Sequence, residues 1–222
     1  MTIHWEILDD HRQALLKRLA LMTYPKGVYL AGGTGLSLQM KLRTSVDFDF
    51  FVPTSFNEEV LYQEIKEAGF TSLDVIHKEA GTLDLRIEGV QVSYFFYPYP
   101  QVAPLITDIH FKALSFASPR DIALMKFQAI GSRGSKKDFY DLYEILKEEK
   151  IPGKDLLKQA KMKFGTHTEL SYFIMGLTYF EDAEDDLLPQ LFVPADWQTI
   201  KDFFIEYAKE VKKNYLSLSK KK

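Results

Sequence analysis

The stretch that decides the fold is residues 28–52, VYLAGGTGLSLQMKLRTSVDFDFFV. Its apolar beginning, residues 28–31, predicts a short strand, and two glycines lead from it into residues 34–42, which are typical of a helix. A second strand is predicted over residues 47–52, where acidic and aromatic side chains alternate until Pro53. A strand, a glycine turn, a helix and another strand in one stretch indicate a sheet covered by helices.

The residues on both sides of this stretch predict further parts of the same layer. An amphipathic helix precedes it, a helix N-capped by Asn57 follows it, and Gly81 and Gly89 mark hairpin turns. The expected helices cover residues 9–22 and 57–68, and the expected strands cover residues 72–78, 82–87, 90–97 and 109–116. This order implies an α+β fold with a mixed sheet flanked by helices.

The pattern turns helical from Ser118 onward, where Ser118 offers an N-cap and Pro119 suits the first helical position. The helices expected there lie near residues 119–130, 136–149, 153–163, 168–181 and 195–217. We therefore predict two domains, an α+β domain over residues 1–117 and a helical bundle over residues 118–222 packed against it.

The composition excludes several classes of protein. With 28 basic and 31 acidic side chains the net charge is −3, so any contact with nucleic acid must be local. The absence of cysteine excludes disulfides, thiolate metal sites and a cysteine nucleophile. Neither a secretory signal nor a membrane-spanning run is present, so we expect a cytoplasmic protein without membrane contact.

Gly32-Gly33-Thr34, between the first strand and its helix, is the first candidate for chemistry. Free backbone N–H groups and the helix dipole can hold phosphate oxygens there, and glycine permits a close approach. The same sequence also serves as a plain tight connection between a strand and a helix. The segment thus predicts a phosphate site only in combination with other signals.

Asp47 and Asp49 are the second candidate. Because side chains alternate in a strand, both aspartates should share one face while Phe48 and Phe50 point to the core. Two close carboxylates repel each other, and a divalent cation such as Mg²⁺ offsets that repulsion. A solvated strand face is the alternative, and the nearby glycine segment favours the metal site.

Charged residues at apolar helix positions form the third candidate. Lys126 falls between Ile122 and Ile130 on the apolar side of its helix, and Asp138 falls on the apolar side of the next helix, with Asp141 at its shoulder. Such charges need a partner or a ligand, so a structural ion pair and a functional site both fit. The basic loop 132–137 between the helices either meets phosphate or is solvated.

Taken in chain order, these segments resemble the AbiEii/AbiGii toxin family of nucleotidyltransferases. The resemblance rests on residues 30–36, residues 43–50, and Lys126 followed by Arg133 and residues 137–142. This family belongs to the polymerase-beta-like superfamily, which implies a nucleotidyltransferase-type mixed sheet. It also implies metal-assisted transfer of a nucleoside monophosphate from a nucleoside triphosphate.

The likeness implies a role for each residue of the motifs. Asp47 and Asp49 would ligate Mg²⁺ or Mn²⁺, Lys126 would neutralise phosphate charge in the transition state, and Asp138 would orient Lys126 or help activate the acceptor. The remaining nucleotide-binding residues would be Gly32, Gly33, Thr34, Arg43 and Ser45.

One position departs from the superfamily pattern. A third carboxylate often stands on a neighbouring strand, and the aligned segment here carries Ser93. Asp84 on the preceding strand, or Asp138, is a substitute for it. Without a third acid the attacking hydroxyl lacks an obvious general base.

The resemblance suggests the toxin of a toxin–antitoxin or phage-defence pair, with RNA such as tRNA as acceptor and an antitoxin protein as partner. Transfer to a protein or a small molecule is one alternative. A catalytically silent nucleotide- or partner-binding protein of the same fold is another.

Overall fold

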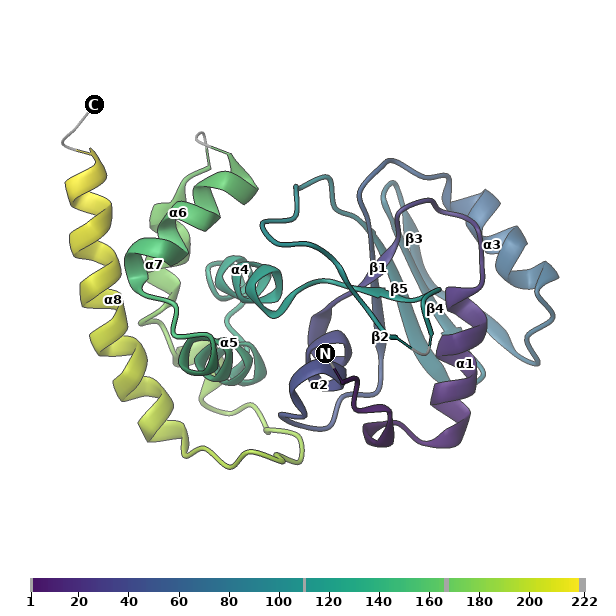
Figure 1. Ribbon diagram of the computed structural model, residues 1–222, viewed down its shortest axis with the longest axis horizontal. Coiled ribbons are helices and arrows are strands. Elements are labelled where there is room, and N and C mark those ends of the chain that lie inside the picture. The colour runs from purple at the N-terminus through teal and green to yellow at the C-terminus, as the bar shows by residue number, and fades with distance from the viewer. Residues whose placement is uncertain (1, 110, 166–167, 220–222) are drawn as a thin grey trace. The chain divides into compact units, whose positions relative to one another are not determined.

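A computed structural model describes residues 2–109, 111–165 and 168–219. The chain forms two compact units, which we call the strand unit and the helical unit (Figure 1). The strand unit comprises Met1–Tyr99 and Pro104–Ser118, and the helical unit comprises Pro100–Ala103 and Pro119–Lys222. Among the described helices, none combines the length and the apolar character that crossing a bilayer requires.

The strand unit is built on a seven-stranded mixed sheet in the order β3-β4-β5-β2-β1-β7-β6. The pairs β2–β5 and β1–β7 are parallel and the other neighbouring pairs are antiparallel. The strands are β1 (Tyr29–Leu30), β2 (Phe48–Val52), β3 (Leu73–Glu79), β4 (Thr82–Ile87), β5 (Val90–Phe96), β6 (Ile106–Thr107) and β7 (Ser115–Phe116). The predicted mixed α+β sheet is confirmed.

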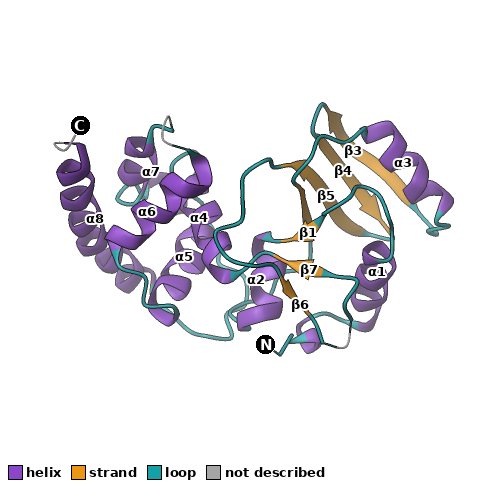
Figure 2. Cartoon of the chain, turned by 45° about the horizontal axis from the view of Figure 1, so that its top comes forward, coloured by secondary structure: helices purple, strands orange, loops and turns teal. Residues whose placement is uncertain are grey.

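One face of this sheet is covered by helices (Figure 2). Leu15, Leu16 and Leu19 of α1 pack in one core with Leu61 and Ile65 of α3 and with the buried side chains of the central strands. The helical elements of this unit are η1 (Trp5–Ile7), α1 (Asp10–Ala20), α2 (Gly32–Met40) and α3 (Glu58–Glu67). Because successive side chains of a strand alternate, the opposite face stays available for polar residues.

The local signals explain where these elements begin. The Asn57 side chain accepts hydrogen bonds from the N–H groups of Glu59 and Val60, so the predicted N-cap of α3 is confirmed. Helix α2 begins at Gly32, two residues earlier than expected, because the turn after β1 is already part of its first turn. The strand expected from Asp47 begins at Phe48.

The strand expected over residues 109–116 is wrong in most of its length. Residue 110 lies outside the described residues, and among the others of this range only Ser115–Phe116 form a strand, β7, which pairs with β6 at Ile106–Thr107. Between them Asp108 accepts hydrogen bonds from the Trp5 indole, at 2.6 Å, and from the N–H of Phe111, at 3.2 Å. An aspartate that bonds the backbone a few residues ahead favours a turn over a strand, which the apolar composition of the segment concealed.

In the helical unit, α4 packs on α5, and α6 packs on α8. Its helices, labelled in Figure 1, are α4 (Pro119–Ile130), α5 (Lys136–Glu148), α6 (Gly153–Phe164), α7 (Leu170–Gly176) and α8 (Trp197–Ser219), and the short helix η2 (Glu181–Ala183) lies between α7 and α8. The helix expected over residues 168–181 is wrong at its C-terminal end, because α7 stops at Gly176 and η2 follows as a separate turn.

A buried ion pair fixes the strap of residues 100–103 to this unit. Lys163 Nζ lies 2.9 Å from Asp121 Oδ1 and 3.1 Å from the carbonyl oxygen of Pro100, and both charged side chains are fully buried. The Asp121 carboxylate also accepts hydrogen bonds from the N–H groups of Val102 and Ala103. Since both charges are paired and hydrogen-bonded, their burial is tolerated.

Candidate active site

The first residue of α2 lies directly against an aspartate of β2. The N–H of Ala31 donates to the carbonyl oxygen of Asp49 at 3.0 Å, which aligns the end of β1 with β2. Gly32 has φ +61°, and a Cβ added there would collide with Asp49 Oδ2 and stand 3.0 Å from Asp49 Cγ. Both the backbone angle and the lack of space therefore require glycine at residue 32.

The second glycine has a basic and a hydroxyl side chain as neighbours. A Cβ added at Gly33 would lie 2.5 Å from Arg43 Nη2 and 2.7 Å from Ser45 Oγ. Arg43 is only 3% exposed, and its Nη1 donates to the carbonyl oxygen of Thr44 at 3.1 Å. A buried guanidinium thus lies beside the N-terminus of α2.

The hydroxyl of Thr34 links α2 to the loop before β2. Thr34 Oγ1 lies 2.9 Å from Ser45 Oγ and 2.5 Å from the carbonyl oxygen of Asp47. Thr34 is buried, Asp49 is half-buried and Asp47 is exposed. In the strand unit, the residues of the predicted motifs therefore lie around the N-terminus of α2.

This helix terminus has free backbone donors by its geometry. The first helical hydrogen bond of α2 runs from the N–H of Gly35 to the carbonyl oxygen of Ala31, at 2.9 Å. The N–H groups of Gly32, Gly33 and Thr34 precede that bond, so they have no partner within the helix. Aligned peptide dipoles add a partial positive charge at this end, which favours an anion.

A row of polar residues crosses three neighbouring strands in line with Asp49. Phe48 and Phe50 are buried in the core, as predicted, so Asp49 belongs to the opposite face of β2. Asp49 pairs in register with Ser93 of β5, and Ser93 pairs in register with Asp84 of β4. Paired residues share a face of the sheet, so Asp49, Ser93 and Asp84 lie side by side.

Asp84 is the member of this row with an unsatisfied atom. Its Oδ1 is buried and has no hydrogen-bond partner within the described part of the chain. A buried carboxylate oxygen without a partner is costly, and such atoms commonly bond to water or an ion, or take part in catalysis. The alternation of side chains along β4 does not predict this environment. The neighbours of Asp84 are set by the register in which β4 pairs with β5.

In the helical unit, Lys126 and Asp138 form the predicted close pair between α4 and α5. Lys126 Nζ lies 2.7 Å from Asp138 Oδ1 and 2.8 Å from Asp141 Oδ2. Ser135 Oγ donates to Asp138 Oδ2 at 2.6 Å, and Arg133 Nε stands 4.0 Å from the same oxygen. The cluster is nearly closed to solvent, since Lys126 is 7%, Asp138 1% and Asp141 0% exposed.

The charge state of Asp138 follows from this environment. Burial alone would raise the pKa of its carboxyl group, but the charge and hydrogen bond of Lys126, the Ser135 hydroxyl and Arg133 act against it. Together they hold the pKa of Asp138 below its ordinary value. Asp138 is therefore ionised at neutral pH and keeps the Lys126 ammonium in place.

Two members of this cluster were not among the predicted site residues. Asp141 stands three residues after Asp138, and Ser135 stands three residues before it. Side chains three apart lie on the same face of a helix, so the spacing within residues 135–141 was the available signal. By helical spacing, Asp141 falls only at the margin of the apolar face.

The donor set of the strand unit suits some cations and not others. Among the described residues, no group of three or more His, Cys, Asp or Glu side chains could hold a metal ion. Mg²⁺ and Mn²⁺ do not require such a cage, because Mg²⁺ binds through one or two carboxylates and completes its shell with water and substrate phosphates. Asp47 and Asp49 beside an anion-attracting helix terminus fit that requirement.

Fold and site together define a nucleotidyltransferase-type protein, and comparison with known proteins agrees. A family model described as nucleotidyl transferase AbiEii toxin, type IV TA system, matches residues 14–214. The chain therefore belongs to this family of nucleotidyltransferase toxins of type IV toxin–antitoxin systems.

Relatives cover nearly the whole chain. An uncharacterized protein of Aquifex aeolicus (strain VF5) is 31% identical over 211 residues, which are 94% of this chain and 99% of that protein. The crystal structure of JHP933 from Helicobacter pylori has a TM-score of 0.53 at 18% identity and covers 96% of this chain and 98% of its own. A candidate nucleotidyltransferase of H. pylori has a TM-score of 0.56 at 17% identity, with 93% and 98% covered. At these identities the two structures show the shared fold.

Proposed function

We propose that this protein transfers a nucleoside monophosphate from a nucleoside triphosphate to an acceptor, with Mg²⁺ or Mn²⁺ bound by Asp47 and Asp49. The observation that carries the proposal is the contact of the Asp49 carboxylate with the first residue of α2. It joins a metal ligand to a backbone anion site, which is the combination that a metal-bound triphosphate needs. When bound, the cation supplies Lewis-acid polarisation of the phosphoryl oxygens.

The chain's own residues would bind and orient the triphosphate. The N–H groups at the start of α2 face its oxygens, and the buried Arg43 guanidinium adds a full positive charge beside Gly33. The Thr34 and Ser45 hydroxyls hold the loop before β2 against α2, so the position of Asp47 is fixed before substrate arrives. Groups fixed in this way need no reorganisation during the reaction.

Of the two candidate proton acceptors, we favour Asp84. Asp138 is already engaged, with Lys126 on one oxygen and Ser135 on the other. Asp84 has an oxygen without a partner in the described chain and lies two strands from Asp49 in the same row. Neighbouring strands are about 4.8 Å apart, so about 10 Å separates the two backbones and leaves room for an attacking hydroxyl.

For the helical unit, we assign to Lys126 the neutralisation of phosphate charge and to Asp138 the orientation of Lys126. The support is the 2.7 Å contact between the two side chains and the lowered pKa of Asp138, which keeps the pair ionised. A lysine held by a charged hydrogen bond loses little freedom when it meets a phosphate.

The acceptor we propose is RNA, such as tRNA, and the partner is a cognate antitoxin protein. The support is membership of a toxin family of type IV toxin–antitoxin systems. We place the reaction in the cytoplasm, where triphosphates and RNA are both present. Transfer to a protein or a small molecule, and a silent binding protein of this fold, are the competing functions.

Labelled transfer separates these functions. The chain is incubated with each α-labelled nucleoside triphosphate, Mg²⁺, and either total tRNA or cell protein. Label in RNA is the expected result, and Asp47→Asn with Asp49→Asn should lower its rate at least about 100-fold. Label in protein supports the first competing function, binding without transfer supports the silent one, and full activity of the double variant contradicts the metal site.

A further inference from the structure

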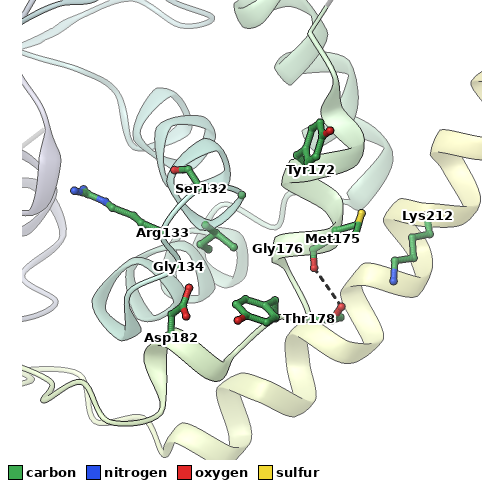
Figure 3. A pocket seen from close by; sticks show the side chains of 12 residues that line it. Ser132, Arg133, Gly134, Tyr172, Met175, Gly176, Thr178, Asp182 and Lys212 are labelled. Atoms are coloured by element: carbon green, nitrogen blue, oxygen red, sulfur yellow. Dashed lines mark hydrogen bonds between the residues drawn. The ribbon is translucent and has the colours of Figure 1, made fainter.

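A cavity of about 490 Å³ opens in the helical unit (Figure 3). Its wall is formed by the end of α4 and the following loop, by α7, by η2 and by α8. Helix α7 packs closely on the end of α4 here, because a Cβ added at Gly176 of α7 would lie 2.6 Å from the carbonyl oxygen of Ile130 in α4. Ligand cavities of a few hundred cubic ångströms are commonly preformed in this way.

Three large side chains that line the cavity are exposed to solvent. Tyr172 is 65%, Met175 64% and Tyr179 49% exposed, although each has a large apolar surface. The hydroxyl of Tyr179 donates to Glu181 Oε2 at 3.2 Å, which orients its ring. Exposed aromatic surface gathered around one concavity indicates a binding site, whereas scattered exposed residues do not.

The polar groups of the cavity restrict the ligand. Lys212 of α8 supplies one ammonium group and Asp182 of η2 one carboxylate, and both line the cavity. Arg133 also lines the cavity, but its side chain points away from Tyr172 and Lys212 (Figure 3) and approaches Asp138. One cation suits a single phosphate, and one carboxylate suits a base that carries an amino group.

We infer that this cavity binds one unpaired nucleotide of the RNA acceptor, with the base on the tyrosine rings, its amino group at Asp182 and its phosphate at Lys212. The inference rests on the proposed transfer to RNA. A nucleoside triphosphate is a poorer match, because its several negative charges exceed the single ammonium group. Aromatic rings beside a basic side chain are the usual means of holding single-stranded nucleic acid.

The cavity is connected with the proposed chemistry through the loop of residues 131–135. That loop lines the cavity on one side, and its residues Arg133 and Ser135 contact Asp138 on the other. A nucleotide in the cavity would therefore rest on the segment that holds the partner of Lys126. The same loop, residues 131–135, would then contact both the acceptor nucleotide and the ion-pair cluster.

The test measures binding of a fluorescein-labelled single-stranded oligoribonucleotide to the full chain, and binding of triphosphate with Mg²⁺. Tyr172→Ala combined with Tyr179→Ala should raise the Kd for the oligonucleotide at least about fivefold per ring. Lys212→Ala should raise it a few-fold and make binding less dependent on salt. The Kd for triphosphate should stay unchanged in the double tyrosine variant and in Lys212→Ala.

Matched controls come from the same unit. Lys213→Ala removes an exposed lysine next to Lys212 on α8 that does not line the cavity. Met162→Ala removes an exposed methionine of α6 outside the cavity. Both controls should bind the oligonucleotide as the wild type does, and thermal unfolding verifies that every variant is folded.

The outcomes distinguish this inference from the proposed function. If RNA is labelled but the tyrosine variants bind and react as the wild type does, the inference is wrong and the proposed transfer stands. If oligonucleotide binding depends on the tyrosines but no RNA is labelled, the cavity is supported and the acceptor assignment is wrong. If the wild type binds no oligonucleotide, both are wrong.

Discussion

Two pairs of aspartates, one in each unit, carry similar charge in opposite settings. Asp47 is exposed and Asp49 half-buried, and Asp47 has no ion pair within the described part of the chain. Asp138 and Asp141 are buried, and Lys126 contacts both. The Asp138 and Asp141 carboxylates thus have an internal cation, whereas the Asp47 side chain is open to solvent. The comparison teaches that acidity alone does not identify a metal site, because the neighbouring charge decides it.

The largest effect on stability should follow removal of the internal cation. Lys126→Met leaves two buried carboxylates without their lysine, so we expect the free energy of unfolding to fall by about 3–5 kcal/mol. Urea denaturation measures this change. Lys158→Met, at an exposed lysine of α6, is the control and should change stability little. A loss below 1 kcal/mol for Lys126→Met would mean that Asp138 and Asp141 do not depend on the buried lysine.

A smaller effect should come from the glycine that faces Asp49. Gly32→Ala should cost about 1–2 kcal/mol of stability because φ is +61°, and it should also lower transfer because the new Cβ displaces the Asp49 carboxylate. Gly69→Ala is a matched control, since Gly69 has φ +71° with nothing within 4 Å. It should lose similar stability and keep full transfer. Equal activity of the two variants would contradict the assigned position of Asp49.

The ion pair of Asp138 with Lys126 should make the stability of the protein depend on pH. Because the pKa of Asp138 is lowered in the folded chain, its stabilising effect is present above about pH 3.9, the ordinary value for aspartate, and is lost as pH falls through the folded value. The stability difference between wild type and Asp138→Asn should therefore shrink as pH is lowered from 6 to 3. When Lys126→Met is also present, the effect of Asp138→Asn on stability should depend less on pH. If its pH dependence stays the same, the titrating group that causes it is paired with something other than Lys126.

The smallest effect on stability is expected at Asp47. Asp47→Asn changes an exposed side chain, so unfolding free energy should change by less than about 0.5 kcal/mol, while labelled transfer should fall sharply. Parallel thermal unfolding and transfer assays measure the two effects. A destabilisation of several kcal/mol would mean that Asp47, like Asp138, has a structural role.

The sequence predicted the burial of individual side chains better than it predicted the bounds of the elements. Strand alternation correctly assigned Phe48 and Phe50 to the core, and helical spacing correctly assigned Lys126 and Asp138 to an apolar surface. The strand predicted over residues 109–116 failed because a local interaction, the bonding of Asp108 to the backbone of Phe111, overrode apolar composition.

By itself, the sequence determined which residues face the same side of one element, and through the ordered motifs it indicated the family. Only the tertiary structure decided which elements meet: Arg43 and Ser45 beside Gly33, Asp84 in line with Asp49, and Lys163 with Asp121. The physical reason is that periodicity arises from the geometry of a single helix or strand. Partners far apart in the chain are chosen by strand register and by the packing of the whole core.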